Sequence, residues 1–539
     1  MKLSIRKGRD DGSLEQLIKR IRSSKKRGVE DVCGVKGIGE VKVVYPMLEG
    51  KNIIEKYTIP NSPVEVFITD QGEYLICDPP LSEERRRKLA RFMSDLIYLL
   101  PDDVTLNDIE KAANILTDAE TYLVTREVFG WGVLDPPIRD PRVEDVNITS
   151  AYAPVLVTHS TYGNLTSNIY FDSEEEVLRL AEKLVHRCGK TISFYHPLSS
   201  IRTPEGHRLT VTYGREVSHT GTSIVVRKFP EFSWSITMQM VRNTIDPAIA
   251  AYFMMLIENR LACIIYGVIG SGKTSMVNSL CNLIPANARI GTIEDTAELK
   301  LAHPYWKPLV VRESYTVDRR GEISQFDLVK HALRMSLDYI IVGEVRGREG
   351  VDWAQAVLTG HGGITSFHAG GPEEVIQRFT SPPISLSLGG LMGVYSMGHM
   401  MRLMREEKGG RRLFVRRMVE VHDVSFSSDS YDIKLFARYD PSRDSFLHIP
   451  DSEVTKLHSM RRIMEVRGWD EDRLMEELRL REAFLTFLRD KAKVDEAFLD
   501  YQMVTKAVWR FYEDPSYFHL ENIALPEKRY MQSIVALRS

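Results

Sequence analysis

Several short segments after residue 260 are rich in hydrophobic residues and carry almost no charge. Residues 263–266 read Cys-Ile-Ile-Tyr, residues 289–293 read Arg-Ile-Gly-Thr-Ile, and residues 339–342 read Tyr-Ile-Ile-Val. Strands that are apolar on both sides are typical of a parallel sheet buried between helices. After the first of them, Met276, Val277 and Leu280 recur at helical spacing. The pattern therefore predicts an α/β domain with a parallel sheet.

The first half of the chain shows a different pattern, in which apolar and polar residues alternate. Residues 40–80 alternate as strands do, as in Val41–Val44 and Val64–Ile68. Residues 143–230 predict two strands, a helix and two further strands. Ser173 and Glu176 form a capping box at the start of this helix, and Gly189 can close it. We expect a smaller α/β module here, with Arg215 in one of its loops.

Helical segments are expected around residues 82–100 and 105–129, and a passage rich in glycine and proline follows, FGWGVLDPPIRDP. We place a domain boundary near Gly130. The predicted organisation is a mixed α/β unit (1–129), the second α/β domain (130–230), a linker (231–244), the nucleotide-binding domain (245–450) and a C-terminal helical region (451–539).

Composition limits the classes of protein to consider. With 539 residues, 43% of them hydrophobic, the chain can form several cores, and about 150 residues per domain suggests three or four units. It has no apolar run of about 18 residues and no apolar segment at its start, so we expect neither a spanning helix nor a signal peptide, and a cytoplasmic location. The five cysteines are scattered, which is typical of reduced thiols. The net charge of −3 argues against general nucleic-acid binding.

Positive charge is concentrated in residues 1–27, where ten Lys and Arg residues accompany three acidic ones. Such a segment favours an anionic lipid surface or an acidic partner. It is equally consistent with a solvated arm, because it has few large apolar residues to insert into a membrane. Both interpretations remain open.

The apolar segment 263–266 runs directly into a complete phosphate-binding motif, GVIGSGKT. Glycines let successive backbone N–H groups surround the phosphates, the lysine adds a positive charge, and the final hydroxyl ligates magnesium. A helix that begins near Lys273 would direct its positive end at the same phosphates. We therefore predict binding of a nucleoside triphosphate, ATP, with Mg²⁺. The binding residues are Gly267, Val268, Ile269, Gly270, Ser271, Gly272, Lys273, Thr274 and Ser275.

Two glutamates follow other buried strands and are candidates for the chemical step. Glu294 directly follows the segment 289–293, and Glu344 follows Tyr339–Val342 after one glycine. Ligands bind at the carboxyl ends of strands in open α/β sheets, and carboxylates there can orient water, accept a proton or hold magnesium. Either residue could instead cap a helix or form an ion pair. We assign Glu344, with Thr274, to the metal, and keep Glu294 as the alternative or assisting base.

The order of four motifs resembles that of the type II/type IV secretion superfamily of hexameric ATPases. The motifs are the phosphate loop, IEDTAEL at 293–299, IVGEVRGREG at 341–350 and TGHGGITSFHA at 359–369. Gly343 before the glutamate is also a feature of that family. The archaeal branch, which drives assembly of type IV-like pili and the archaellum, is the most similar over residues 130–515. The resemblance implies a RecA-like P-loop motor domain preceded by a smaller PAS-like α/β domain, with C-terminal helices.

The resemblance also implies roles for histidines and arginines. His361 and His368 stand where family members sense the nucleotide or couple subunits, although either could satisfy backbone carbonyls instead. Arg346 follows the second glutamate. Three more arginines, Arg208, Arg215 and Arg227, match nucleotide-contacting or finger positions, with Arg227 as a binding residue. A finger arginine is worth about 10³ to 10⁵ in rate, but each of these could also be a surface ion pair.

The function expected from the resemblance is a homohexameric motor that hydrolyses Mg-ATP. It would rotate the 131–230 module against the motor domain and act on a polytopic membrane platform protein, so the hexamer would lie at the cytoplasmic face of the membrane. The sequence leaves open pilus assembly, an archaellum and protein secretion. Alternatives are a DNA- or protein-translocating ATPase of the same superfamily, which salt-dependent DNA binding would indicate, and a non-hydrolysing assembly scaffold.

Overall fold

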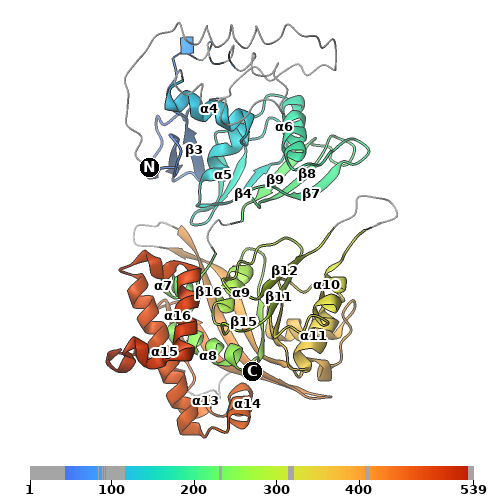
Figure 1. Cartoon of the computed structure of the whole chain (residues 1–539). Helices are drawn as coiled ribbons and strands as arrows, with labels where there is room; N and C mark the ends of the chain where they lie inside the picture. The colour runs from blue at the N-terminus through green and yellow to red at the C-terminus, as the bar shows by residue number, and fades with distance from the viewer. Residues whose placement is uncertain are drawn as a thin grey trace. The chain divides into compact units, whose positions relative to one another are not determined.

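The computed structural model describes residues 43–82, 84, 85, 87, 89, 92, 116–229, 233–312, 321–406 and 412–531. Contacts divide the chain into two units, Met1–Phe229 and Pro230–Ser539 (Figure 1). The basic segment 1–27 and most of the helix expected at 82–100 lie outside the described residues. Within them, no helix combines the length and the apolar character that a membrane crossing needs.

The N-terminal unit is built on one nine-stranded sheet. Its strands, in chain order, are β1 (Ile53–Thr58), β2 (Glu65–Thr69), β3 (Glu73–Cys77), β4 (Val143–Ile148), β5 (Leu156–His159), β6 (Gly163–Ser167), β7 (Leu198–Arg202), β8 (Arg208–Thr212) and β9 (Ser223–Arg227). They lie in the order β1-β2-β3-β6-β5-β4-β9-β8-β7. The helices are α4 (Asp118–Val128), α5 (Asp135–Arg139) and α6 (Glu174–Arg187).

This sheet joins residues on both sides of Gly130. β3 pairs with β6 in parallel, and strands from both sides contribute to a single hydrophobic core. The finer division at Gly130 remains a prediction. The helix α6 is confirmed: the Ser173 side chain accepts the Glu176 N–H, and Gly189 has the positive φ of a helix end. Three strands, not the expected two, flank it on each side.

One predicted strand of this unit is wrong. Of the strand expected at Val41–Val44, residues 41 and 42 lie outside the described residues, and neither Val43 nor Val44 lies in a strand. The Val44 N–H instead donates to Asp78 Oδ2 at 2.8 Å, which ties this extended segment to a side chain. A backbone donor satisfied in this way does not need a neighbouring strand.

The C-terminal unit contains a ten-stranded mixed sheet. Its strands are β10 (Ala262–Tyr266), β11 (Ile290–Glu294), β12 (Trp306–Val310), β13 (Tyr339–Val342), β14 (Gly362–Phe367), β15 (Val394–Glu406), β16 (Arg412–Phe426), β17 (Tyr431–Asp440), β18 (Ser445–His448) and β19 (Arg529–Tyr530). The order is β12-β11-β13-β14-β10-β15-β16-β17-β18-β19. The pairings from β12 to β15 are parallel, and β15 to β18 are antiparallel.

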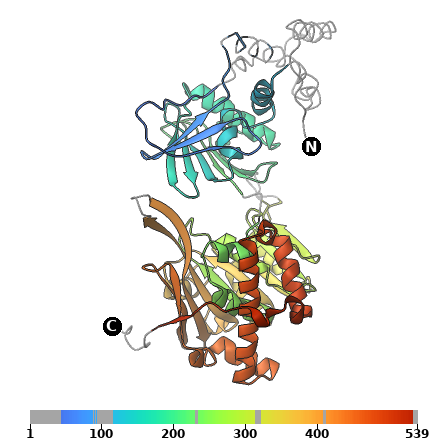
Figure 2. The ribbon, with the colours of Figure 1, turned by 90° about the vertical axis from the view of Figure 1, so that its left-hand side faces the viewer.

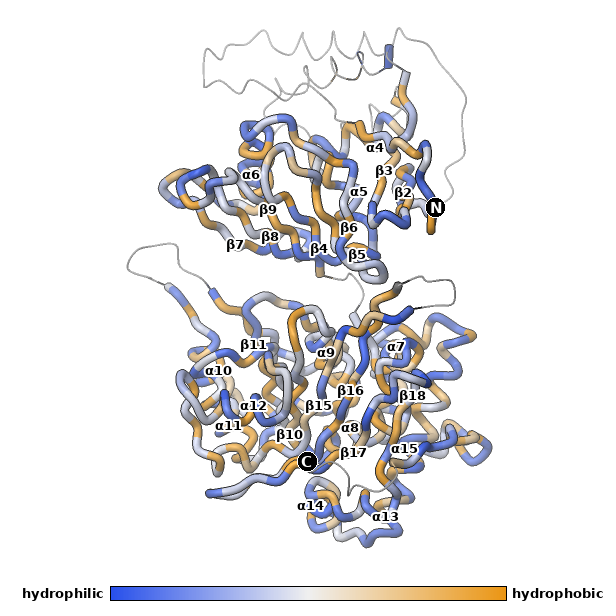
Figure 3. The backbone as a smooth tube through the Cα atoms, turned by 180° about the vertical axis from the view of Figure 1, so that it is seen from behind, coloured by the Kyte–Doolittle hydropathy of each residue, from blue (hydrophilic) through white to orange (hydrophobic). Residues whose placement is uncertain are grey.

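Helices cover both faces of the parallel part. They are α7 (Ile236–Val241), α8 (Pro247–Glu258), α9 (Lys273–Cys281), α10 (Gln325–Ala332), α11 (Glu349–Leu358) and α12 (Pro372–Thr380). Along β10, Cys263 and Ile265 join the core beside α8 and α9, whereas Ile264 and Tyr266 join the core beside α11 and α12. Figure 3 shows hydrophobic residues along these inner strands. The expected RecA-like α/β fold of this domain is confirmed.

The C-terminal helices belong to the same unit. They are α13 (Asp451–Val454), α14 (His458–Arg467), α15 (Glu471–Ala492) and α16 (Tyr501–Glu513). Figure 2 shows α15 and α16 close together. The rings of Phe484 on α15 and Phe511 on α16 stack with their centroids 4.4 Å apart. Both helices share the core of α7 and α8. The segment 231–244, expected to be a linker, contains the helix α7.

Candidate nucleotide-binding site

The predicted phosphate loop lies between β10 and α9, as the motif requires. All five residues of β10 are buried, and α9 begins at Lys273. Gly272 has φ +93°, a left-handed conformation that a residue with a side chain rarely adopts. A Cβ on Gly267 would lie 2.1 Å from the carbonyl oxygen of Met400. The glycines therefore fit both the turn and its close approach to β15.

Lys273 points back across the loop. Its Nζ lies 2.9 Å from the Val268 carbonyl oxygen and 3.3 Å from Nδ1 of His368. The Ser271 N–H donates to the same Val268 oxygen at 3.3 Å. Val268 therefore provides the acceptor that the loop would otherwise find in a phosphate oxygen. A nucleotide would have to displace this carbonyl.

His368 connects the lysine to the candidate base. It follows β14, and its Nε2 lies 2.8 Å from Oε1 of Glu344. An ammonium group can only donate, so Nδ1 must accept from Lys273 and the proton of a neutral ring must sit on Nε2, facing Glu344. Burial and the charge of Lys273 lower the pKa of His368. The ring is therefore neutral at physiological pH.

Glu344 is held ionised by its neighbours. Its Oε2 accepts from Nη2 of Arg346 at 2.6 Å. Burial alone would raise the pKa of the Glu344 carboxyl, but the hydrogen bond and charge of Arg346, with the charge of Lys273, hold it below its usual range. The carboxylate is thus charged at neutral pH, as a general base must be.

Arg346 joins two carboxylates that follow adjacent strands. Besides Glu344, it donates through Nη1 to Asp295 Oδ2 at 3.2 Å. β11 and β13 are paired in parallel, so their carboxyl ends open at one edge of the sheet. Lys273, His368, Glu344, Arg346 and Asp295 form one chain of contacts along this edge.

Glu294 has a different environment. Its side chain is buried, and Oε1 accepts the N–H groups of Glu298 and Leu299 at 2.9 and 3.0 Å. The carboxylate therefore shapes the turn after β11, where no helix begins, so it does not cap a helix. Its part in catalysis stays a prediction.

The two histidines of the motif lie at opposite ends of β14. His361 precedes the strand, and its Nδ1 lies 3.0 Å from the Ala356 carbonyl oxygen at the end of α11. His368 follows the strand, beside Lys273. The structure does not bring His361 to the phosphate loop of its own chain, so only a role toward another subunit remains as a prediction.

The three arginines predicted outside the motor domain belong to the N-terminal unit. Arg208 and Arg227 are paired across β8 and β9. Arg227 also contacts Asp145 at 3.1 Å, and Arg208 donates to Ser200 Oγ at 3.2 Å. Arg215 is exposed in the loop between β8 and β9. Their contact with a nucleotide stays a prediction.

Two arginines that the sequence did not single out contact this site. Arg416 on β16 donates through Nε to the Gly270 carbonyl oxygen at 3.0 Å. Arg378 on α12 donates to the His368 carbonyl oxygen and lies 5.0 Å over the Phe367 ring. Neither belongs to a phosphate-binding motif. Both lie within residues 130–515, over which the sequence resembles the family, but the four motifs include neither.

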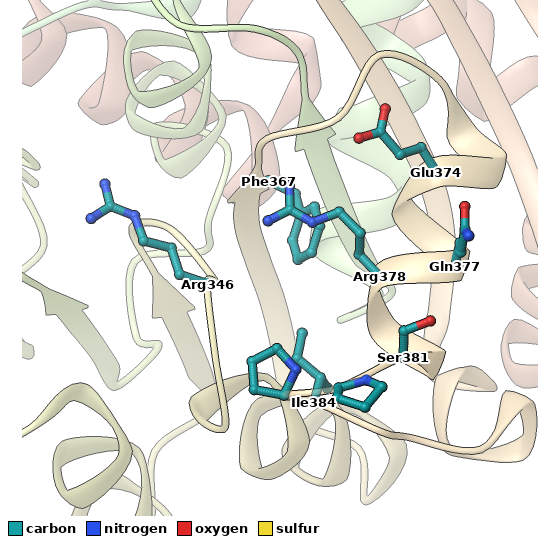
Figure 4. A pocket seen from close by; sticks show the side chains of 9 residues that line it. Arg346, Phe367, Glu374, Gln377, Arg378, Ser381 and Ile384 are labelled. Atoms are coloured by element: carbon teal, nitrogen blue, oxygen red, sulfur yellow. The ribbon is translucent and has the colours of Figure 1, made fainter.

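A pocket of about 320 Å³ opens beside this edge of the sheet (Figure 4). Arg346 lines it from the loop after β13, and Arg378, Gln377 and Ser381 line it from α12 and its end. Figure 4 shows the Arg346 guanidinium turned away from α12. Phe367, Pro382, Pro383 and Ile384 also line the pocket, which therefore has polar and apolar sides, and through Arg346 it adjoins Glu344.

The residues present fit a nucleotide with magnesium. Gly272 is in contact with the Arg416 side chain, and a Cβ there would lie 3.0 Å from Arg416 Cδ, so this edge of the loop has no room for a side chain. Thr274 lies in the first turn of α9. Glu344 follows β13, which is separated from β10 in the sheet only by β14. A hydroxyl and a carboxylate are oxygen donors of the kind that Mg²⁺ prefers.

Comparisons with known proteins identify several similar chains. Residues 157–386 match the family model described as type II/IV secretion system protein. The uncharacterized protein MJ0900 of Methanocaldococcus jannaschii is 26% identical over 494 residues, 84% of this chain and 87% of its own length. The putative conjugal transfer protein MT3759 of Mycobacterium tuberculosis is 32% identical over 298 residues, 53% of this chain and 80% of its own. The structure of the Yersinia pseudotuberculosis ATPase DotB is 14% identical over 69% of this chain and 90% of its own, with a TM-score of 0.40.

Proposed function

Because the chain belongs to the type II/IV secretion system protein family, we propose that it is a magnesium-dependent ATPase that works as a homohexameric motor. The observation that carries this proposal is the chain of contacts from Lys273 through His368 to Glu344. In this chain of contacts Lys273 begins α9, His368 follows β14 and Glu344 follows β13, and that arrangement supports the proposal. A site that only bound nucleotide would not need a charged base beside the γ-phosphate.

The residues divide the work of hydrolysis among them. Lys273 and the loop amides bind the phosphates once Val268 is displaced. Lys273 then leaves Nδ1 of His368, and the imidazole donates its Nε2–H either to Glu344 or to the γ-phosphate. Glu344 accepts a proton from the attacking water, since its low pKa keeps it ionised. Thr274 and Glu344 would hold Mg²⁺, which supplies charge stabilisation to the phosphates.

Arg346 controls access to the base in this scheme. It now donates to Glu344 at 2.6 Å, which occupies one lone pair of that oxygen and makes the carboxylate less basic. Asp295 offers the guanidinium a second acceptor at 3.2 Å. We propose that Arg346 moves toward Asp295 or the γ-phosphate when ATP enters. Movement of this kind would link nucleotide binding to activation of the base.

The wider role is proposed from the family. The motor would act on a polytopic platform protein at the cytoplasmic face of the membrane and drive assembly of type IV-like pili or archaella, or protein secretion. The match to an archaeal protein over 84% of the chain supports the archaeal branch. DNA translocation is the alternative, and salt-dependent DNA binding would favour it.

The deciding experiment is the ATPase rate per subunit against protein concentration, with sizing in parallel, for the wild type and Lys273→Ala. A rate that rises as a hexamer forms and disappears in the variant supports the ring motor. Magnesium-dependent binding of ATP without turnover at any concentration, with or without membranes carrying the platform protein, contradicts it and favours a scaffold.

A further inference from the structure

The β15–β16 hairpin lies against the phosphate loop, and none of the four sequence motifs predicted this contact. The Met400 carbonyl oxygen of β15 would lie 2.1 Å from a Cβ on Gly267. Arg416 of β16 lies against the other side of the loop, with its Cδ 3.0 Å from the Cβ position of Gly272. The hairpin therefore packs on both the first and the last glycine of the motif.

Arg416 also makes a directional contact with the loop. Its Nε donates to the Gly270 carbonyl oxygen at 3.0 Å. That carbonyl shares a rigid peptide plane with the Ser271 N–H, and in a trans peptide the two groups point in opposite directions. Holding the carbonyl toward β16 turns the Ser271 N–H inward, where it now meets the Val268 oxygen at 3.3 Å.

This inward N–H is one of the donors that a phosphate oxygen would use. We propose that Arg416 is a positioning residue of the nucleotide site, which holds the Gly270–Ser271 peptide in the orientation that binds the polyphosphate. The proposal rests on the proposed nucleotide function. It adds a role for β16, which contributes nothing to the four sequence motifs.

Further positive charge surrounds Arg416. Arg402 faces it across the strand pair, so both side chains leave the same face of the hairpin. Arg242 is close enough that burial and the charge of Arg416 lower its pKa. Several positive charges beside a site for the polyphosphate raise the rate at which the nucleotide associates with it. Arg416 would thus assist association as well as orientation.

The hairpin supplies a matched control. Arg405 lies on the same strand as Arg402 but three residues further along, so its side chain leaves the opposite face. It pairs with Asp444. Arg405→Gln therefore removes one positive charge from the same hairpin without touching the loop.

The test compares Mg-ATP affinity and association rate in the full chain for wild type, Arg416→Gln, Arg416→Lys and Arg405→Gln, using a fluorescent ATP analogue in stopped flow. Loss of a charge-assisted hydrogen bond predicts roughly tenfold weaker binding, or more, for Arg416→Gln. Arg416→Lys should keep the wild-type association rate, because its positive charge remains. The ATP analogue should dissociate from it faster than from wild type, because an ammonium lacks the planar guanidinium whose Nε donates to the Gly270 carbonyl. Arg405→Gln stays within about twofold of wild type on this reasoning.

Two results overturn the proposal. One is an affinity for Arg416→Gln within twofold of wild type; the other is an equal loss in Arg405→Gln. In steady state, a positioning role raises KM and leaves kcat nearly unchanged. If Arg416→Gln does not fold, Arg416→Lys tests the proposal instead. The ATP analogue must then dissociate faster from Arg416→Lys than from wild type, and an unchanged dissociation rate overturns the proposal. A wild type that binds ATP but never hydrolyses it contradicts the proposed motor, while the affinity ratios still decide the role of Arg416.

Discussion

Replacing Glu344 with glutamine removes the charge that the chemical step needs and keeps the shape of the site. The amide oxygen can still accept from Arg346, which now donates to Glu344 at 2.6 Å. The amide nitrogen, however, faces the Nε2–H of His368 across 2.8 Å, where two donors meet. The variant therefore loses the base and loosens the contact with His368.

The expected loss of turnover follows from the role of the carboxylate. A general base contributes about 10² to 10⁴ in rate, or about 3–5 kcal/mol of barrier. ATP binding should be retained, because Lys273 and the loop amides are unchanged and one negative charge near the phosphates is removed. We expect an affinity within about threefold of wild type on this ground. The assay is single-turnover hydrolysis at saturating ATP, with affinity measured separately.

Glu294→Gln is the matched control. Glu294 accepts two backbone N–H groups at the turn after β11, so this change should lower stability by about 1–3 kcal/mol and leave the rate within about tenfold. A Glu344→Gln rate within tenfold of wild type would refute the assignment of the base. If Glu294→Gln instead lost 10²-fold or more, as a missing general base does, that glutamate would be the base.

Three further outcomes are expected. Arg346→Gln removes the main influence that lowers the pKa of Glu344, so burial dominates and the acid limb of the kcat/KM profile moves to higher pH; an unchanged limb would contradict this. His361→Ala removes a contact at the end of α11 and should cost about 1 kcal/mol in chemical denaturation, with turnover per hexamer within about twofold, unless the residue acts between subunits. Arg215→Ala should lower kcat by about 10³ or more with ATP affinity retained if this exposed arginine is a finger in trans, whereas an equal collapse of binding would make it an ordinary ligand contact.

Much of the motor domain follows from local sequence. The strand Tyr339–Val342 has the predicted bounds, and α9 begins at Lys273 as the motif required. Uninterrupted apolar runs specify buried parallel strands because both faces must be covered. Glycine spacing specifies the phosphate loop because few other residues adopt its conformation.

Contacts between distant segments could not be predicted in this way. His361 and His368 belong to one motif, but an extended strand rises about 3.3 Å per residue, so they end at opposite edges of the sheet. Arg416 reaches Gly270 because β16 pairs with β15, and β15 with β10. The pattern of hydrophobic residues along the sequence does not predict that order of strands.

The sequence by itself determined the phosphate loop, the α/β class and the glutamates at strand ends, since these depend on residue types within a few positions of one another. The tertiary structure alone decided which of those groups meet. Glu344 contacts His368, which contacts Lys273. Glu294 accepts backbone N–H groups in the turn after β11, and Arg416 donates to the Gly270 carbonyl of the phosphate loop. The physical reason is that sheet order and packing bring together side chains whose separation along the chain carries no information about their distance in space.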